Sequence, residues 1–304
     1  MDFAGKRFWF YLISLAVIIP GIIFLIIAPG LKTGIDFTGG STMNLSLSEP
    51  MTQSTLRKEL NNLGYSEATI QRLDDNSFFI RTKELNEDKK NAIVNGIQNN
   101  FPQQIIEVLS FDLVSPIVAN ETVINAFWAV LAASFFVFIY ILWAFRSVPH
   151  TIRYSFAAIT ALLHDTIIIL GIFAILGKLM DIEVNTFFLF AIVTVIGYSI
   201  NDTIVIFDRL RENINLYPND NFSKIVNTSI RESLGRSLNT SITLLITLTA
   251  LLLFGGSTIQ TFLLVLLFGV IVGTYSSIGV ASQILVSWEE NDIKKLFSKK
   301  NITR

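Results

Sequence analysis

The chain has 304 residues, of which 51% are hydrophobic and only 15% are charged, whereas soluble domains carry about 25% charged residues. This composition excludes a soluble enzyme, a disordered chain and a nucleic-acid binder with a basic face, and the net charge of −1 indicates no acidic or basic partner. With no cysteine and two histidines, thiol chemistry and disulfides are excluded, and neither a metal site nor a cofactor is expected.

Six stretches are long and apolar enough to cross a bilayer core, which takes about 20 helical residues. They are residues 8–28, 122–145, 154–177, 184–207, 237–254 and 259–288. The first follows Lys6 and Arg7, but it is too long for the core of a signal peptide and lacks a cleavage pattern. We therefore predict an α-helical polytopic membrane protein with six transmembrane helices, the first of which is an uncleaved anchor.

The distribution of basic residues predicts which ends of the spans lie on the cytoplasmic side of the membrane. They cluster around Lys6, Arg146, Arg231 and Lys299, whereas the two short loops on the other side hold only Lys178. Because short basic loops stay inside, both termini are predicted to be cytoplasmic. The predicted divisions are residues 1–30 with the first span, 31–121 as an external domain, 122–288 as a five-helix bundle with a cytoplasmic loop at 208–236, and 289–304 as a basic cytoplasmic tail.

The hydrophilic insert between the first two spans has a regular pattern. Strands are predicted at 41–48, 68–73, 77–82 and 104–114, and helices at 52–63, with Thr52 as N-cap, and at 86–101. The order β-α-β-β-α-β predicts a small α+β ferredoxin-like domain. That fold names no function, and the insert has no catalytic constellation, so a gripping module and a solvated spacer both stay open.

A glycine-rich run, GIDFTGG, joins the first span to this insert and includes Gly34, Asp36, Gly39 and Gly40. A phosphate-binding loop would need a lysine and a following helix, whereas this run has no lysine and precedes a strand. The run is therefore predicted to be a tight connector, with Asp36 capping a turn.

Acidic residues inside the spans are the candidate functional residues, because an ionised side chain at the bilayer centre costs at least ~2.5–3.5 kcal/mol. Asp202 lies in the fourth span among polar neighbours that we take as its support, Tyr198, Asn201 and Thr203. Asp165 lies in the middle of the third span.

Each acid has one candidate ionisable partner. Arg236, at the start of the fifth span, lies where a helical hairpin would bring it beside Asp202. Burial favours the neutral form of a carboxyl and a nearby arginine favours its ionised form, so a carboxyl subject to both effects can bind and release protons. The alternative is that Asp202 and Arg236 form a static ion pair between helices. Beside Asp165 stands only His164, which we expect to donate a hydrogen bond between helices, so a proton role for Asp165 is less strongly indicated.

Four motifs resemble those of the SecF family of protein-export membrane subunits, in the expected order over nearly the whole chain. The run GYSINDTIVIFDRLREN at 197–213 resembles the fourth-span motif of the family, and GIDFTGG at 34–40 resembles its opening motif. RSLNTS at 236–241 and GTYSSI at 273–278 are similar to its fifth and sixth spans.

This resemblance implies a function. SecF works with SecD in a twelve-span assembly related to RND transporters, of which a six-span chain is one half. The assembly uses the proton-motive force to assist late steps of export through the SecYEG channel, after SecA has acted. The implied partners are SecD, SecYEG, SecA, YajC, the unfolded preprotein and membrane lipid, in the bacterial cytoplasmic membrane. Asp202 is implied as the proton carrier and Arg236 as its charge partner, with a weaker role for Asp165.

Three other functions are rivals to this one. An RND-type exporter predicts twelve spans and two external domains in one chain, and an intramembrane aspartyl protease predicts a GxGD motif that is missing here. A structural subunit that stabilises SecD without proton coupling stays open. No enzymatic chemistry and no nucleic-acid partner are expected.

Overall fold

The computed structural model describes residues 2–27, 29–83, 85–256 and 259–290, so the predicted basic tail lies almost wholly outside the described residues. The chain divides into two compact units, residues 33–126 and residues 1–32 with 127–304. We call the first the α+β domain and the second the helical bundle.

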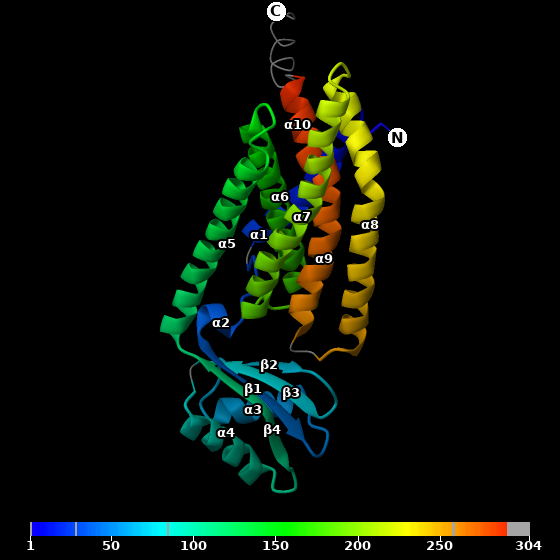
Figure 1. Ribbon diagram of the computed structural model, residues 1–304. Helices are drawn as coiled ribbons and strands as arrows, with labels where there is room; N and C mark the ends of the chain where they lie inside the picture. Colours follow the sequence, from blue (N-terminus) through cyan, green and yellow to red (C-terminus); the bar gives the residue numbers. More distant parts are fainter. Residues whose placement is uncertain (1, 28, 84, 257–258, 291–304) are drawn as a thin grey trace, which may run out of the picture. The chain divides into compact units, whose positions relative to one another are not determined.

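Six helices are long and apolar enough to cross a membrane, as the sequence predicts. They are α1 (Arg7–Ile26), α5 (Pro116–Ala144), α6 (Thr151–Met180), α7 (Thr186–Leu216), α8 (Phe222–Phe254) and a sixth made of α9 (Gln260–Ser276), the π-helical segment η2 (Ser277–Ala281) and α10 (Ser282–Glu289). In the bundle, α1 begins and α10 ends at the same end (Figure 1).

The stretch predicted as a loop, residues 208–236, is mostly helical. Only residues 217–221 connect α7 to α8. The first half of α8 is amphipathic, and its apolar side chains Ile225, Val226 and Ile230 are buried. The side chain of Asn213 on α7 also donates to Ser229 Oγ at 3.0 Å. These contacts pack the first half of α8 against α7, in the same helix as the fifth span.

Three helices make the centre of the bundle. In α6, α7 and the sixth span, 50%, 50% and 56% of the most apolar window is buried, against 11% in α1 and 6% in α5. Close approach depends on small residues, as is usual between membrane helices. Gly21 of α1 lies against Gly171 of α6, and Gly269 and Gly273 of α9 lie against Val195 and Ser199 of α7.

The α+β domain has the predicted order of elements. It contains the short helix α2 (Ile35–Thr38), then β1 (Gly40–Leu47), α3 (Gln53–Asn62), β2 (Thr69–Arg72), β3 (Ser77–Thr82), α4 (Glu87–Asn100) and β4 (Ile106–Val114). The strands form an antiparallel sheet in the order β2-β3-β1-β4. This topology confirms the ferredoxin-like prediction.

Period-two alternation explains the core of this domain, because alternate residues of a strand face one side of the sheet. Met43 and Leu45 of β1 and Phe78 and Ile80 of β3 are buried. They belong to the same core as the buried apolar residues of the two helices, Leu56, Leu60, Ile93 and Ile97. At the start of α3, Thr52 Oγ1 accepts a bond from the Thr55 amide at 3.2 Å, so the predicted N-cap is confirmed.

Candidate functional site

Asp202 lies on α7 among hydroxyl groups from two other helices, and its side chain is 2% exposed. Thr274 Oγ1 of α9 donates to Asp202 Oδ2 at 3.2 Å. Thr274 is itself joined to Ser241 of α8, with 2.6 Å between the two hydroxyl oxygens, and Ser241 bonds the Tyr198 hydroxyl at 3.1 Å. The carboxylate therefore lies at the end of a chain of hydroxyls that links α7, α8 and α9.

A further hydroxyl stands beside this carboxylate. Ser237 of α8 faces Asp202, and its buried oxygen has no hydrogen-bond partner within the described residues.

The structure does not pair Asp202 with Arg236 as predicted. Arg236 is exposed, and in the described part of the chain no carboxylate lies within ion-pair distance of it. The reason is helical phase: consecutive residues of a helix point about 100° apart. Ser237 faces Asp202, so Arg236 is turned away from it.

Arg236 instead lines a pocket of about 460 Å³ between α5, α7 and α8. Asn201 lines the same pocket and is exposed, so this predicted supporting residue does not contact the Asp202 carboxylate. Asp208 and Arg211 of α7 also line this pocket and form an ion pair at 2.7 Å.

Asp165 is the more deeply buried acid, with 1% of its surface exposed. Ser199 Oγ of α7 and Ser276 Oγ of α9 donate to Asp165 Oδ2 at 2.6 and 2.8 Å. His164 Nδ1 lies 2.9 Å from Asp165 Oδ1, and its Nε2 lies 2.9 Å from Ser14 Oγ of α1. The expected interhelical bond of His164 is therefore present. Residues of α6, α7 and α9 contact the carboxyl itself, and α1 is joined to it through His164.

One helix contacts both acids. Thr274 and Ser276, two residues apart near the end of α9, donate to Asp202 and to Asp165 respectively. The next residue, Ser277, begins η2 and bonds Thr203 at 2.8 Å between hydroxyl oxygens. π-helical turns inside α-helices occur frequently at functional sites. Of the predicted supporting residues, Tyr198 belongs to the Asp202 network and His164 bonds Asp165. Thr203 bonds Ser277 and neither acid, and Asn201 joins neither network.

Sequence reasoning missed Thr274 and Ser276 as partners of the acids. In the sequence they belong to a run of small residues that indicates close helix packing. That indication is also correct, because the neighbouring Gly273 lies against Ser199. The alternation of glycine and hydroxyl residues was the available signal, since hydroxyls on a close-packed face are often hydrogen-bond donors between helices.

The connector motif is a tight turn stabilised from within the α+β domain. Gly34 is the N-cap of α2, so Asp36 lies in the first turn rather than capping it. Gly39 and Gly40 have φ of +71° and +123°, which favour glycine. Arg81 donates to the carbonyl of Thr33 at 2.8 Å and to Thr38 Oγ1 at 3.0 Å.

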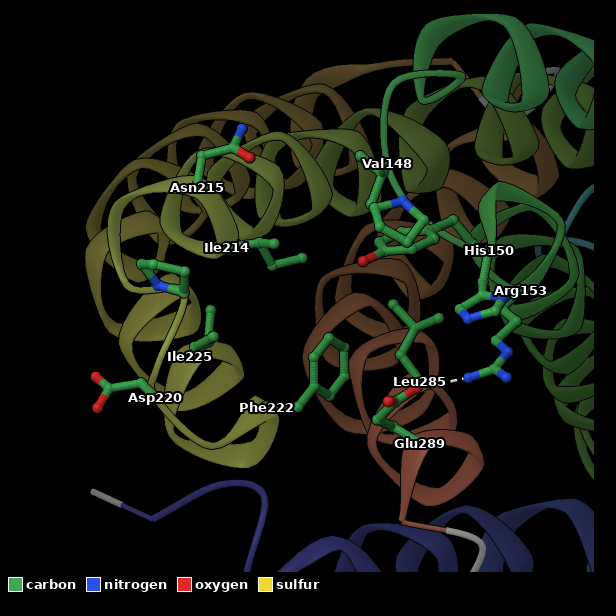
Figure 2. Close-up of a pocket in the computed structure, with 13 residues that line it drawn as sticks. Val148, His150, Arg153, Ile214, Asn215, Asp220, Phe222, Ile225, Leu285 and Glu289 are labelled. Carbon is green, nitrogen blue, oxygen red and sulfur yellow. Dashed lines mark hydrogen bonds and ion pairs between the residues drawn. The ribbon is translucent and has the colours of Figure 1, made fainter.

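A separate pocket of about 440 Å³ opens between the α5–α6 loop, the α7–α8 connection and α10 (Figure 2). Its walls are mainly apolar and include Phe222 and Ile225 of α8 and Leu285 of α10. At its rim Arg153 and Glu289 form an ion pair at 2.6 Å. It contains neither membrane acid. In the residues that the structure describes, no cluster of three His, Asp or Glu side chains is arranged to hold a metal ion.

Comparisons with known proteins identify relatives along the whole chain. The family model for the C-terminal region of the protein export membrane proteins SecD and SecF matches residues 94–291. The protein translocase subunit SecF of Thermobaculum terrenum is 41% identical over 98% of this chain and 97% of its own. The protein translocase subunit SecF of Anaerolinea thermophila is 37% identical over 98% of this chain and 97% of its own.

Fused relatives match along part of their length. The protein translocase subunit SecDF of Bacillus subtilis is 34% identical over 97% of this chain and 39% of its own length. The crystal structure of SecDF from Thermus thermophilus, a translocon-associated membrane protein, superimposes with a TM-score of 0.80 and 32% identity, over 95% of this chain and 39% of that chain.

Proposed function

This chain belongs to the SecF family of protein translocase subunits, and from that premise we propose that it couples the proton-motive force to protein export. It would do so with SecD in the bacterial cytoplasmic membrane, with both termini inside. The working partners are the SecYEG channel, SecA, YajC and the unfolded preprotein at a late stage of its passage. The role involves no enzymatic reaction and no cofactor, since the gradient supplies the energy.

The observation that supports proton binding is a buried carboxyl without a cation. Asp202 is 2% exposed and is surrounded by hydroxyls, and Arg236 points elsewhere. An unpaired ionised carboxylate at membrane depth costs at least ~2.5–3.5 kcal/mol, which a proton removes. Hydroxyls suit both states, because each can donate to a carboxylate and accept from a protonated carboxyl. Asp202 is therefore proposed as the proton carrier.

Binding of a proton would change the contacts of α9. When Asp202 is ionised, the Thr274 hydroxyl donates to it; when it is protonated, the direction of that bond can reverse along Ser241 and Tyr198. α9 also bonds Asp165 through Ser276 and continues directly into η2. We propose that α9 transmits the protonation state of Asp202 to the rest of the bundle, with Asp165 and His164 as a second, coupled group.

The energy available is sufficient for this task. One proton crossing the membrane supplies about 2.3 kcal/mol per 100 mV, and about 1.4 kcal/mol changes an equilibrium constant tenfold. A single proton can therefore bias two conformations of the assembly by more than tenfold.

A face of the bundle is suited to the SecD half. The side chains of Asn201, Arg236 and Asn239 are exposed on α7 and α8, two helices long and apolar enough to cross a membrane, and have no partner within the described part of the chain. Lipid tails cannot satisfy an amide or a guanidinium group, so such groups usually contact another membrane segment or a polar cavity. The chain spans 39% of the SecDF relatives, whose remaining length has room for a second set of helices. We propose that SecD covers this face and gives Arg236 its acceptor.

The decisive experiment compares Asp202→Asn with wild type in inverted vesicles that contain the chain, SecD, SecYEG and SecA. Precursor export is measured with and without an imposed proton gradient. We expect the gradient to stimulate wild type and not Asp202→Asn, whereas Asp208→Asn on the same helix, an exposed acid paired with Arg211, should respond like wild type. If the gradient stimulates export equally with Asp202→Asn and with Asp208→Asn, the result would instead support the alternative of a structural subunit that stabilises SecD.

A further inference from the structure

The chain passes from the helical bundle into the α+β domain between Lys32 and Thr33. On the bundle side, Lys32 is held by the loop that joins α6 to α7. Its backbone carbonyl accepts from the Val184 amide at 2.8 Å. Its ammonium group pairs with Glu183 at 3.3 Å and also with Asp181. We call Lys32 with these three loop residues the Lys32 clamp.

The α6–α7 loop has the backbone shape that this clamp needs. Asp181, directly after α6, has a φ of 63°, in the left-handed region that few residues other than glycine, asparagine and aspartate adopt. Gly177, one turn earlier, leaves room for Lys32, because a methyl group added there would lie 3.2 Å from the lysine Cβ. The Lys32 side chain is only 24% exposed. The clamp is therefore a packed contact, unlike the freely moving ion pairs of a protein surface.

On the other side of the crossing point, Thr33 is held by the sheet of the α+β domain. Arg81 of β3 donates to the Thr33 carbonyl at 2.8 Å and to Thr38 Oγ1 at 3.0 Å. Gly34, the next residue, is buried and is the N-cap of α2. The crossing therefore has no slack linker, because adjacent residues are fixed to the bundle and to the domain. A displacement of Lys32 is passed to the domain through one peptide link.

The clamp joins this crossing point to both membrane acids. The loop continues α6, which carries Asp165, and leads into α7, which carries Asp202. α1, which ends shortly before Lys32, is also joined to α6 inside the bundle. Ser14 Oγ lies 2.9 Å from His164 Nε2, and a pair of glycines lets the two backbones touch farther along. α1, α6 and α7 therefore form one connected body that ends at Lys32.

The second connection of the domain, through α5, is looser. Only 6% of the most apolar window of α5 is buried. Phe138 packs against Phe156 of α6 at 5.6 Å, and the Ala144 carbonyl accepts from Arg211 of α7 at 3.4 Å, but both contacts lie in the second half of α5, which is remote from the domain in the sequence. An apolar pocket of about 430 Å³ opens between α5 and α6. A displacement within the bundle therefore reaches the domain more directly through α1 than through α5.

We propose that the Lys32 clamp is a positioning element of the translocase, which transmits the shifts of α6 and α7 on proton binding to the α+β domain. The inference rests on the proposed function, because it takes proton binding at Asp202 to move these helices. Contiguous chains of packed groups and ion pairs carry coupling of this kind between distant sites. Loss of the clamp would leave the acids able to bind protons and the domain folded, but would uncouple one from the other.

The clamp itself is tested by the freedom of the α+β domain. Because the chain has no cysteine, Ser66→Cys in the domain and Gly256→Cys after α8, both at exposed positions, accept spin labels selectively. The distribution of distances between the labels is measured by pulsed electron spin resonance in vesicles that also contain SecD. We expect Lys32→Gln to broaden this distribution. The matched control is Lys83→Gln, an ion-paired lysine within the α+β domain that is 82% exposed, and it should leave the distribution unchanged.

A charge swap separates the ionic contact from the shape of the lysine side chain. Lys32→Glu should broaden the distribution further, since it places three carboxylates together. Adding Glu183→Lys and Asp181→Asn restores one ion pair of opposite polarity, and asparagine keeps the left-handed backbone, so the narrow distribution should return. A distribution as narrow in Lys32→Gln as in wild type, or no recovery in the swapped variant, would each overturn the inference.

The route of transmission is tested by export. A two-glycine insertion between Lys32 and Thr33 adds slack on the α1 side, and the same insertion between Ser115 and Pro116 adds slack on the α5 side. In vesicles with SecD, SecYEG and SecA, we expect the first insertion and Lys32→Gln to lose most of the stimulation of export by the proton gradient. The second insertion and Lys83→Gln should retain it. A loss with the α5 insertion that equals or exceeds the loss with the α1 insertion would contradict the proposed route.

The clamp and proton coupling can fail separately. If the gradient stimulates wild type and not Asp202→Asn, but stimulates Lys32→Gln as strongly as wild type, the clamp inference fails and the proposed function stands. If the gradient stimulates wild type and Asp202→Asn alike, although Lys32→Gln broadens the distances, proton coupling fails and the clamp stands as the contact that positions the domain.

Discussion

The contact between Gly21 and Gly171 allows a quantitative prediction. A methyl group added at Gly171 would lie 2.6 Å from the Gly21 Cα, whereas ordinary contacts begin at 3.4 Å, so α1 and α6 must separate by roughly 0.8 Å. The obstacle is backbone, which cannot rotate aside. Overpacking of this kind typically lowers the free energy of unfolding by ~1–3 kcal/mol. The higher helix propensity of alanine than of glycine raises it by up to ~1 kcal/mol.

The control variant, Gly235→Ala, corrects for the change in helix propensity. At Gly235 of α8 an added methyl group meets nothing within 4 Å, so Gly235→Ala gains the same propensity without the clash. We expect the free energy of unfolding of Gly171→Ala to be lower than that of Gly235→Ala by ~1–3 kcal/mol. Each kcal/mol should lower the melting temperature by about 2–4 °C. The assay is thermal unfolding of the purified full chain in detergent, followed by tryptophan fluorescence.

The same variant should also affect the site. Ser14 and Gly21 are seven residues apart on α1, as His164 and Gly171 are on α6, so both pairs lie on one face two turns apart. Separation at the glycines should therefore lengthen the 2.9 Å bond between His164 and Ser14. Melting temperatures of Gly171→Ala at or above those of Gly235→Ala would show that the two helices are not in close contact, and would refute this reasoning.

Two further predictions concern the acid site and the N-terminus. Thr274→Val removes the hydroxyl that donates to Asp202 at nearly constant side-chain volume, so gradient-stimulated export should fall. The control Thr243→Val lies on an exposed face of α8 and should have no effect. An unchanged response in Thr274→Val would show that this hydroxyl is dispensable. Near the N-terminus, the Gly5 amide and then the Asn227 side chain lower the pKa of Asp2, because both donate to its ionised form. The stabilisation is therefore present above the unfolded pKa of about 3.9 and is lost as pH falls through the lower folded value. The protection of the Gly5 amide, measured as its exchange rate relative to the intrinsic rate at each pH, should therefore fall only in strong acid. Asn227→Ala should shift that loss of protection to higher pH.

The two polar networks explain why the bundle tolerates buried acids. Each carboxyl is bonded by hydroxyls from helices that are distant in sequence, Thr274 for Asp202 and Ser199 and Ser276 for Asp165. Buried polar groups that are satisfied specify one arrangement of helices, because any slippage would leave them unpaired. The same bonds therefore also fix the register of α6, α7 and α9.

The sequence by itself determined the local elements of this protein. Six apolar runs set the number of spans, because only an α-helix satisfies its backbone within an isolated segment of the bilayer. Period-two alternation and the cap at Thr52 determined the βαββαβ domain, since both patterns depend on neighbours a few residues away. Asp202 and Asp165 were recognisable for the same reason, as charges within apolar runs.

Only the tertiary structure decided what those acids contact. Arg236 and Ser237 are adjacent in the sequence, yet helical phase directs the serine to Asp202 and the arginine away from it. Thr274 lies 72 residues from Asp202, and Ser276 lies 111 residues from Asp165. Such contacts depend on the rotation and depth of whole helices, which glycine contacts such as Gly273 against Ser199 set, and no local pattern encodes that rotation.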